Sequence, residues 1–357
     1  MTQPDIFFTV KILTFFLASF LIALFFAPLL IRTLHRYKAW KKKPRERTIG
    51  GGATPIFTKL HGEKEVSTPR MGGILVWGTV LFVTLMTVVI SQFLPPPLAE
   101  NINFVSRSQT WLPLFTLISA SLLGLIDDLL VIQNRGGYIG GGMRFKVRFL
   151  LIFLIALIGA WWFYYKLGWS SIFIPFYGNL PIDGLYLGIF VTVVLATFSG
   201  GVVDGLDGLS AGALIPIFAA FGTIAYFTQL YDLTVLISII IGALITYLWF
   251  NVHPAQFYMG ETGIMGLTVT LAVIAFLTNS VAFLPIIASV LVIESGSVIL
   301  QLLSKQIRGK KIFLSAPIHH HFEALGWPET QVTMRFWIIS AVSSGVGLIL
   351  YFLSKVF

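Results

Sequence analysis

The sequence has no cysteine and few charged residues. Only 11% of its 357 residues are Asp, Glu, Lys or Arg, 56% are hydrophobic, and the mean hydropathy is +0.88. Without cysteine, the chain forms no disulfides, thiolate metal sites or cysteine nucleophiles. Such a low charge content excludes an ordinary soluble globular protein and indicates an integral membrane protein.

Apolar runs follow one another along the chain, and each is long enough to cross a bilayer, which takes about 20 residues. We predict an all-α, polytopic membrane protein with a single transmembrane catalytic domain over 1–357. In the loop before the fifth expected helix, aromatic and β-branched residues around Gly178 and Asn179 predict a small hairpin. The ten expected helices lie at roughly 6–31, 71–93, 111–132, 149–167, 183–203, 207–228, 233–251, 263–281, 283–303 and 335–355.

Basic residues are concentrated in three stretches. Of the 24 Lys and Arg, 11 lie in 32–70, four in 133–149 and five in 304–335. Because clustered Lys and Arg mark cytoplasmic loops, we expect these stretches in the cytoplasm and both termini outside. We attribute the net charge of +9 to this topology and to contact with membrane lipids. We expect no nucleic acid partner, since such proteins spread basic residues over a folded face.

Acidic residues border the same basic stretches. Asp127 and Asp128 lie near the end of the third expected helix, and an ionised carboxylate in a membrane usually faces a wet cavity or a partner. The plainer interpretation is that they end the helix and contact water. Asp204 and Asp207 would share one face if they were helical, and the glycines around them would allow a ligand to approach closely. Alternatively, Asp207 caps the next helix.

Two further segments contain candidate ligands. Glu261 stands near glycines in a short loop, and carboxylates together with substrate phosphates are the usual ligands of Mg²⁺; a helix cap is the alternative. His319, His320 and His321 follow a basic run, and adjacent histidines cannot all face one metal ion. We therefore favour phosphate binding over zinc, with a solvated loop as the plainer alternative. Glu294, inside the ninth helix, is expected to be structural.

A membrane protein with acids at its basic side is typical of an enzyme or a transporter. A proton-coupled transporter would hold its acids near the bilayer midplane and use paired broken helices. Here the acids cluster at the expected cytoplasmic ends of the helices, which favours an enzyme that handles phosphates.

Several segments, taken together, resemble the phospho-N-acetylmuramoyl-pentapeptide transferase family, within the polyprenyl-phosphate N-acetylhexosamine-1-phosphate transferase superfamily (glycosyltransferase 4). The resemblance covers nearly the whole chain in order, and the histidine run separates this family from its sugar-phosphate transferase relatives. The matching segments are Ser67-Thr-Pro-Arg-Met-Gly-Gly73, Leu123-Gly-Leu-Ile-Asp-Asp128, Asp204-Gly-Leu-Asp-Gly-Leu-Ser210, Pro254-Ala-Gln-Phe-Tyr-Met-Gly-Glu261, the run 308–329 and its extension 334–340.

The resemblance implies a homodimer in the bacterial inner membrane with a cleft that faces the cytoplasm. It implies Mg²⁺-dependent transfer of phospho-MurNAc-pentapeptide from UDP-MurNAc-pentapeptide to undecaprenyl phosphate, which gives lipid I and UMP in cell-wall synthesis. By position in these motifs we assign catalytic roles to Asp127, Asp128, Asp204 and His319, Mg²⁺ binding to Glu261, and substrate binding to Asn251, Tyr258, His320, His321, Asp207, Arg70 and Lys64.

The chain departs from the family pattern at several positions. Glu261 replaces the usual Asp, Gly201 replaces an Asn, and Arg70 replaces a Thr beside the expected phosphate site. Glu65 stands at the family's lysine position, with Lys64 one residue away. These changes suggest a divergent branch. A polyprenyl-phosphate N-acetylglucosamine-1-phosphate transferase is the alternative within the superfamily.

Overall fold

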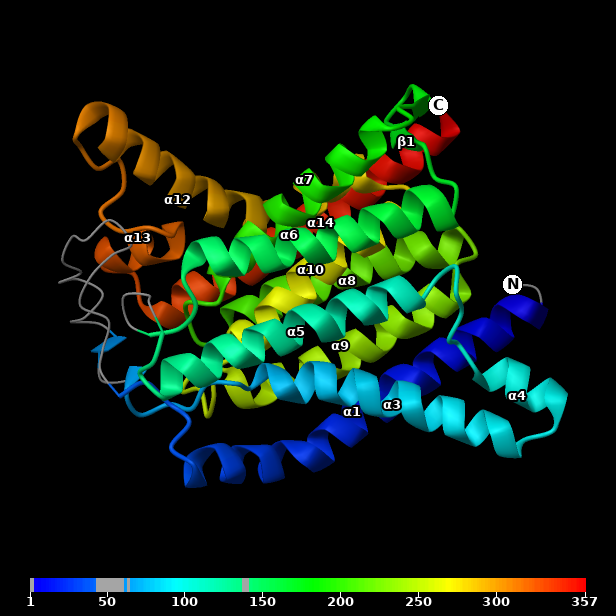
Figure 1. Cartoon of the computed structure of the whole chain (residues 1–357), viewed down its shortest axis with the longest axis horizontal. Helices are drawn as coiled ribbons and strands as arrows, with labels where there is room; N and C mark the ends of the chain where they lie inside the picture. Colours follow the sequence, from blue (N-terminus) through cyan, green and yellow to red (C-terminus); the bar gives the residue numbers. More distant parts are fainter. Residues whose placement is uncertain (1–2, 43–60, 63–64, 137–140) are drawn as a thin grey trace.

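The computed structural model describes residues 3–42, 61–62, 65–136 and 141–357. Most of its helices run along one long axis, with both termini at one end and α13 at the other (Figure 1). The long helices are α1 (Gln3–Arg36), α3 (Gly73–Phe93), α5 (Trp111–Ile132), α6 (Phe145–Trp161), α7 (Leu185–Ser199), α8 (Leu209–Phe227), α9 (Tyr231–Asn251), α10 (Glu261–Leu277), α12 (Ser289–Arg308) and α14 (Glu329–Val356).

The all-α, polytopic architecture is confirmed. Among the described residues, nine helices are long and apolar enough to cross a membrane, and α10 is a shorter apolar helix of 17 residues. It ends at Leu277, before the predicted 281, because Asn279 is left-handed (φ +48°) and the N–H of Ser280 bonds back to the Ala275 carbonyl at 2.9 Å. Pro285, which has no N–H, then falls in the first turn of a separate short helix.

Short elements complete the fold. The predicted hairpin is present as β1 (Ser171–Ile174) paired antiparallel with β2 (Gly178–Pro181), and Ser171 lies opposite Pro181. Its turn falls at 175–177, so that Gly178 and Asn179 belong to the second strand rather than to the turn. The other short elements are α4 (Pro96–Ile102), the π-helical turn η1 (Trp162–Lys166), the 3₁₀ turns η2 (Gly200–Val203) and η3 (Val281–Phe283), α11 (Leu284–Ile287) and α13 (Ile318–Ala324).

Glycines bring the central helices into close contact. A Cβ atom on Gly73 of α3 would lie 2.3 Å from the Cα of Gly263 in α10, and one on Gly266 of α10 would lie 2.1 Å from Ser121 Oγ of α5. Small residues allow helix backbones to approach in this way inside membranes. The side chains of α10 after its first residue are buried, whereas α1 exposes large apolar side chains such as Phe25, as expected of a helix that faces lipid.

Candidate active site

The end of α5 places two carboxylates against the first turn of α10. Gly124 makes this possible, because a Cβ atom there would lie 2.1 Å from the carbonyl oxygen of Glu261. Thr262 donates its N–H to Asp128 Oδ2 at 3.0 Å. The helix continues beyond both aspartates to Ile132, and Asp127 and Asp128 are 3% and 0% exposed. They therefore do not end the helix in water, as the plainer interpretation required.

Two arginines lie against these carboxylates. Arg148, in the first turn of α6, donates from Nη1 to Glu261 Oε1 at 2.6 Å, and the same Nη1 lies 3.5 Å from Asp127 Oδ2. Arg70 donates from Nε to Asp128 Oδ1 at 3.3 Å. Burial lowers the pKa of Arg70, but the carboxylates around it, Asp128 first, raise that pKa by more. Arg70 thus stays charged and lies among the acids.

Asp204 joins this group from the turn between η2 and α8. Its Oδ1 accepts a hydrogen bond from Ser210 Oγ at 2.8 Å, and its Oδ2 accepts one from the N–H of Gly260 at 3.1 Å. Gly260 directly precedes Glu261, so these bonds hold Asp204 beside the first turn of α10. Burial raises the pKa of the Asp204 carboxyl above its ordinary value, and the hydrogen bond from Ser210 opposes that rise.

Asp204 and Asp207 do not share a helix face, because the chain between η2 and α8 is a turn. Gly208 has φ +76° and is the N-cap residue of α8, a conformation that favours glycine, so Asp207 does not cap the helix. Asp207 instead accepts hydrogen bonds at Oδ2 from His253 Nδ1 at 2.9 Å and from the N–H of Ala255 at 3.2 Å. Asp204 and Asp207 therefore have different hydrogen-bond partners.

Asn251 and Tyr258 border the acids in the segment that joins α9 to α10. The Asn251 side chain is buried, accepts the N–H of Gly208 at 2.9 Å and donates to the carbonyl of Phe257 at 2.8 Å. It ties the Asp204 turn to the loop before α10. Tyr258 is half-buried, and its N–H donates to the Pro69 carbonyl at 2.7 Å. Their substrate-binding roles stay predictions.

His319 lies beside the Asp204 turn. Both His319 and Glu294 of α12 have no exposed surface, and Glu294 Oε2 accepts a hydrogen bond from His319 Nδ1 at 2.8 Å. His319 Nε2 has no hydrogen-bond partner among the described residues. A Cβ atom on Gly205 would lie 2.3 Å from this nitrogen, so only glycine admits it here. Glu294, expected to be structural, thus fixes the orientation of a predicted catalytic histidine.

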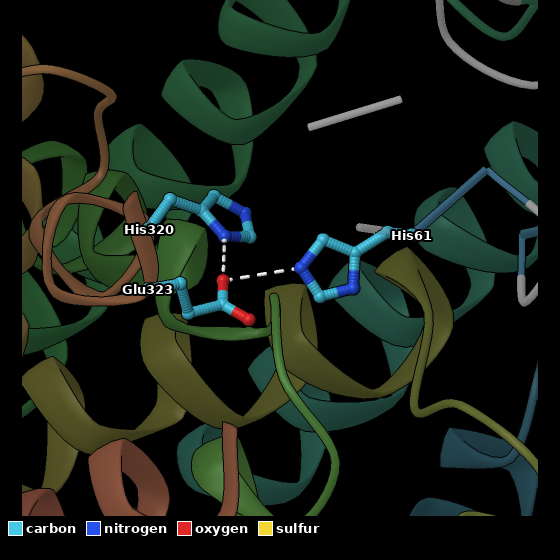
Figure 2. Close-up of side chains that lie close together, drawn as sticks. All are labelled: His61, His320 and Glu323. Atoms are coloured by element: carbon cyan, nitrogen blue, oxygen red, sulfur yellow. Dashed lines mark hydrogen bonds and ion pairs between the residues drawn. The ribbon is translucent and has the colours of Figure 1, made fainter. Parts of the chain in front are cut away.

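His320 points to a different partner. Its Nδ1 donates to Glu323 Oε2 at 2.7 Å, and His61 Nε2 donates to the same oxygen at 3.1 Å (Figure 2). Their three ligand atoms lie within 4.8 Å of one another, so the group could hold a metal ion. We call these three residues the clasp, because they join the segment before α3 to α13.

The third histidine, His321, contacts the segment before α13. Its Nδ1 accepts the N–H of Leu314 at 3.2 Å, so His319, His320 and His321 do not converge on one point. Lys64, the remaining predicted substrate-binding residue, lies outside the described residues.

The clasp predicts acid-sensitive stability. Burial and the neighbouring His319 lower the pKa of His320 to about 3. Burial alone would raise the pKa of Glu323, but the hydrogen bonds from His320 and His61 outweigh burial and lower that pKa to about 2. Because both values lie below the ordinary ones of 6.5 and 4.5, the unfolded chain takes up protons that the folded chain does not. The stabilising effect of neutral His320 is therefore lost as the pH falls from 6.5 towards 3.

Thermal unfolding of the detergent-solubilised protein tests this effect. Between pH 7 and pH 5, His320 is expected to account for a loss of about 2 kcal/mol in the free energy of unfolding, which His320→Gln should abolish. The exposed His35→Gln is the matched control and should keep the wild-type pH slope. An unchanged slope in His320→Gln would show that His320 does not sense the acid.

The acids at the first turn of α10 fit a hard divalent cation. Mg²⁺ takes oxygen ligands, usually one or two carboxylates together with substrate phosphates. The guanidinium of Arg148 is a cation held between Asp127 and Glu261, so these two carboxylates already direct oxygens at one positive group. Asp127 and Glu261 are therefore the residues that would hold the ion, in the place where Arg148 now lies.

Sequence reasoning missed three contributors to this site. Arg148 was interpreted only as a sign of topology, although a charge in the first turn of an apolar helix can turn inward. Glu294 and His61 are far in sequence from their hydrogen-bond partners, His319 and Glu323. For Glu294, burial of an acid inside an apolar span was the available signal.

Comparison with known proteins gives consistent matches. The model of glycosyl transferase family 4 matches residues 110–279, which contain all the acids around the first turn of α10. A phospho-N-acetylmuramoyl-pentapeptide-transferase of Borrelia hermsii is 33% identical over 349 residues, 92% of this chain and 92% of the relative. Proteins of the same name from Bartonella quintana and Geobacillus are 35% and 31% identical, over 80% and 92% of this chain and 80% and 94% of each relative. This chain therefore belongs to the phospho-N-acetylmuramoyl-pentapeptide-transferase family.

Proposed function

We propose that this chain transfers phospho-MurNAc-pentapeptide from UDP-MurNAc-pentapeptide to undecaprenyl phosphate, giving lipid I and UMP for peptidoglycan synthesis. The observation that carries the proposal is the gathering of Asp127, Asp128, Asp204 and Glu261 with Arg70 around the first turn of α10. Phosphoryl transfer depends mainly on positioning and on stabilisation of charge. Fixed carboxylates and guanidinium groups in one buried place supply both.

The residues of the site have separate roles in the transfer. An oxygen of the acceptor phosphate attacks the phosphorus that bears the sugar, and the bond from that phosphorus to UMP breaks. Asp127 or Asp204 deprotonates or orients the acceptor; a two-step path through an aspartyl phosphate is the alternative. Arg70 and His319 lie next to the acids and are suited to hold phosphate oxygens. Mg²⁺, when bound by Asp127 and Glu261, would neutralise the donor diphosphate.

The proposed setting is the bacterial inner membrane, as one transmembrane domain over 1–357 that forms a homodimer and serves cell shape and division. The basic stretches support a cytoplasmic active site. Both termini lie at the end of the bundle opposite α13 (Figure 1), which supports termini outside and histidines inside.

A donor comparison tests the reaction directly. Purified protein with undecaprenyl phosphate and Mg²⁺ is expected to release UMP from UDP-MurNAc-pentapeptide and at least about 100-fold less from UDP-GlcNAc, because a lost set of polar contacts costs that much in discrimination. Formation of the lipid-linked product is measured alongside. Preference for UDP-GlcNAc would instead support the N-acetylglucosamine-1-phosphate transferase.

A further inference from the structure

Arg148 lies between two of the acids, Asp127 and Glu261, and the proposed mechanism gives it no role. It lies in the first turn of α6, and its side chain is only 13% exposed. One nitrogen, Nη1, reaches both Glu261 Oε1 and Asp127 Oδ2, at 2.6 and 3.5 Å. The guanidinium is thus a fixed positive charge bound by two carboxylates from two other helices.

A divalent ion and this guanidinium need the same oxygens. Mg²⁺ binds carboxylate oxygens directly at about 2.0–2.1 Å and strongly prefers octahedral geometry. An N–H group that donates to Glu261 Oε1 occupies a lone pair of that oxygen that the ion could otherwise use. Two cations in one partly buried place also repel each other, since screening by water is weak there. Arg148 in its present position therefore opposes binding of the ion.

We infer that Arg148 is a tethered competitor for the divalent-cation site of this chain. Without the ion, Arg148 neutralises Asp127 and Glu261 and holds α5, α6 and α10 together. When the ion binds, the guanidinium is displaced, so Arg148 weakens the affinity of the site for the ion. This inference rests on the proposed function, because it takes the acid group to be the cation site of the transfer.

The affinity for Mn²⁺, a paramagnetic substitute for Mg²⁺, tests the competition without any substrate. Electron paramagnetic resonance of free Mn²⁺ is measured on purified wild-type protein, Arg148→Gln and Arg144→Gln. Arg144 lies exposed just before α6, so its replacement removes the same charge without breaking a contact to the acids. We expect Arg148→Gln to bind Mn²⁺ at least tenfold more tightly, and Arg144→Gln to stay within threefold of wild type. Glu261→Gln should lose this binding.

Equal or weaker Mn²⁺ binding by Arg148→Gln would overturn the inference, as would equal tightening in Arg144→Gln, which would indicate a long-range effect of charge. If Arg148→Gln does not fold, Arg148→Lys decides. Its side chain is shorter and lacks the planar guanidinium, so it should hold the two carboxylates less well and allow tighter Mn²⁺ binding than in the wild type. A protein that releases no UMP from either donor would refute the proposed function, while the Mn²⁺ measurement would still decide the competition.

Discussion

Replacing Asp204 or Asp127 by asparagine is expected to reduce UMP release by about 10²- to 10⁴-fold, the usual contribution of a positioned general base. Asparagine has nearly the shape of aspartate but cannot take a proton. At position 204 it also places an NH₂ group opposite either Ser210 Oγ or the N–H of Gly260, both of which now donate to the carboxylate. The loss should therefore appear in kcat as well as in kcat/KM.

The exposed Asp183→Asn is the matched control, since its positive φ of 43° is a conformation that asparagine tolerates. It should keep wild-type turnover. The pH profile gives a second readout, because a general base must be ionised to act. Burial raises the pKa of Asp204, so the wild-type kcat/KM should decrease with falling pH, with an apparent pKa above that of an ordinary aspartate. Near-normal turnover in both Asp204→Asn and Asp127→Asn would remove the proposed role of these acids.

Replacing His319 by alanine is expected to lower UMP release by at least about 100-fold, because a buried imidazole beside the Asp204 turn would be lost. Glu294→Gln should lower kcat by about 10- to 100-fold, the usual effect of a partner that orients a functional histidine. Glutamine can donate as well as accept at Nδ1, so it no longer fixes the tautomer that Glu294 fixes. Because Glu294 touches no substrate in this proposal, KM should change little.

Ser295→Ala is the control for Glu294→Gln, because Ser295 neighbours Glu294 in α12 and, among the described residues, its hydroxyl donates to the Leu291 carbonyl. It removes a hydrogen bond from the same helix without reaching His319. Gly205→Ala adds a separate test, since its Cβ atom would collide with His319 Nε2 and should reproduce the loss in kcat. Full activity in Glu294→Gln would show that His319 needs no orienting partner.

The membrane-spanning helices could be predicted from the sequence because membrane spans require long apolar runs, whatever their partners. The third span, for example, runs from Trp111 to Ile132 as expected. Helix ends were less predictable, since they depend on single groups: the left-handed Asn279 ends α10 early, and α6 starts at Phe145, before the expected 149. The latter shift placed Arg148 inside a helix.

The site itself could be predicted only as a set of residues. The motifs named Asp127, Asp204 and His319, but their mutual positions depend on close contacts between helices distant in sequence, such as Gly124 against Glu261. The spacing of Asp204 and Asp207 suggested a shared helix face, and the left-handed Gly208 makes a turn instead. Periodicity describes a regular element and cannot describe the turn that interrupts it.

The depth of Asp128 has a consequence for how two unlike molecules meet. It lies four residues before the last residue of α5, which at 1.5 Å per residue is about 6 Å from the helix end. With the end of α5 at the membrane surface, as proposed, that distance would place Asp128 at the depth of the headgroup layer rather than in the oily interior. A water-soluble nucleotide and a carrier anchored by its tail could then exchange a phosphosugar with neither one leaving its own medium.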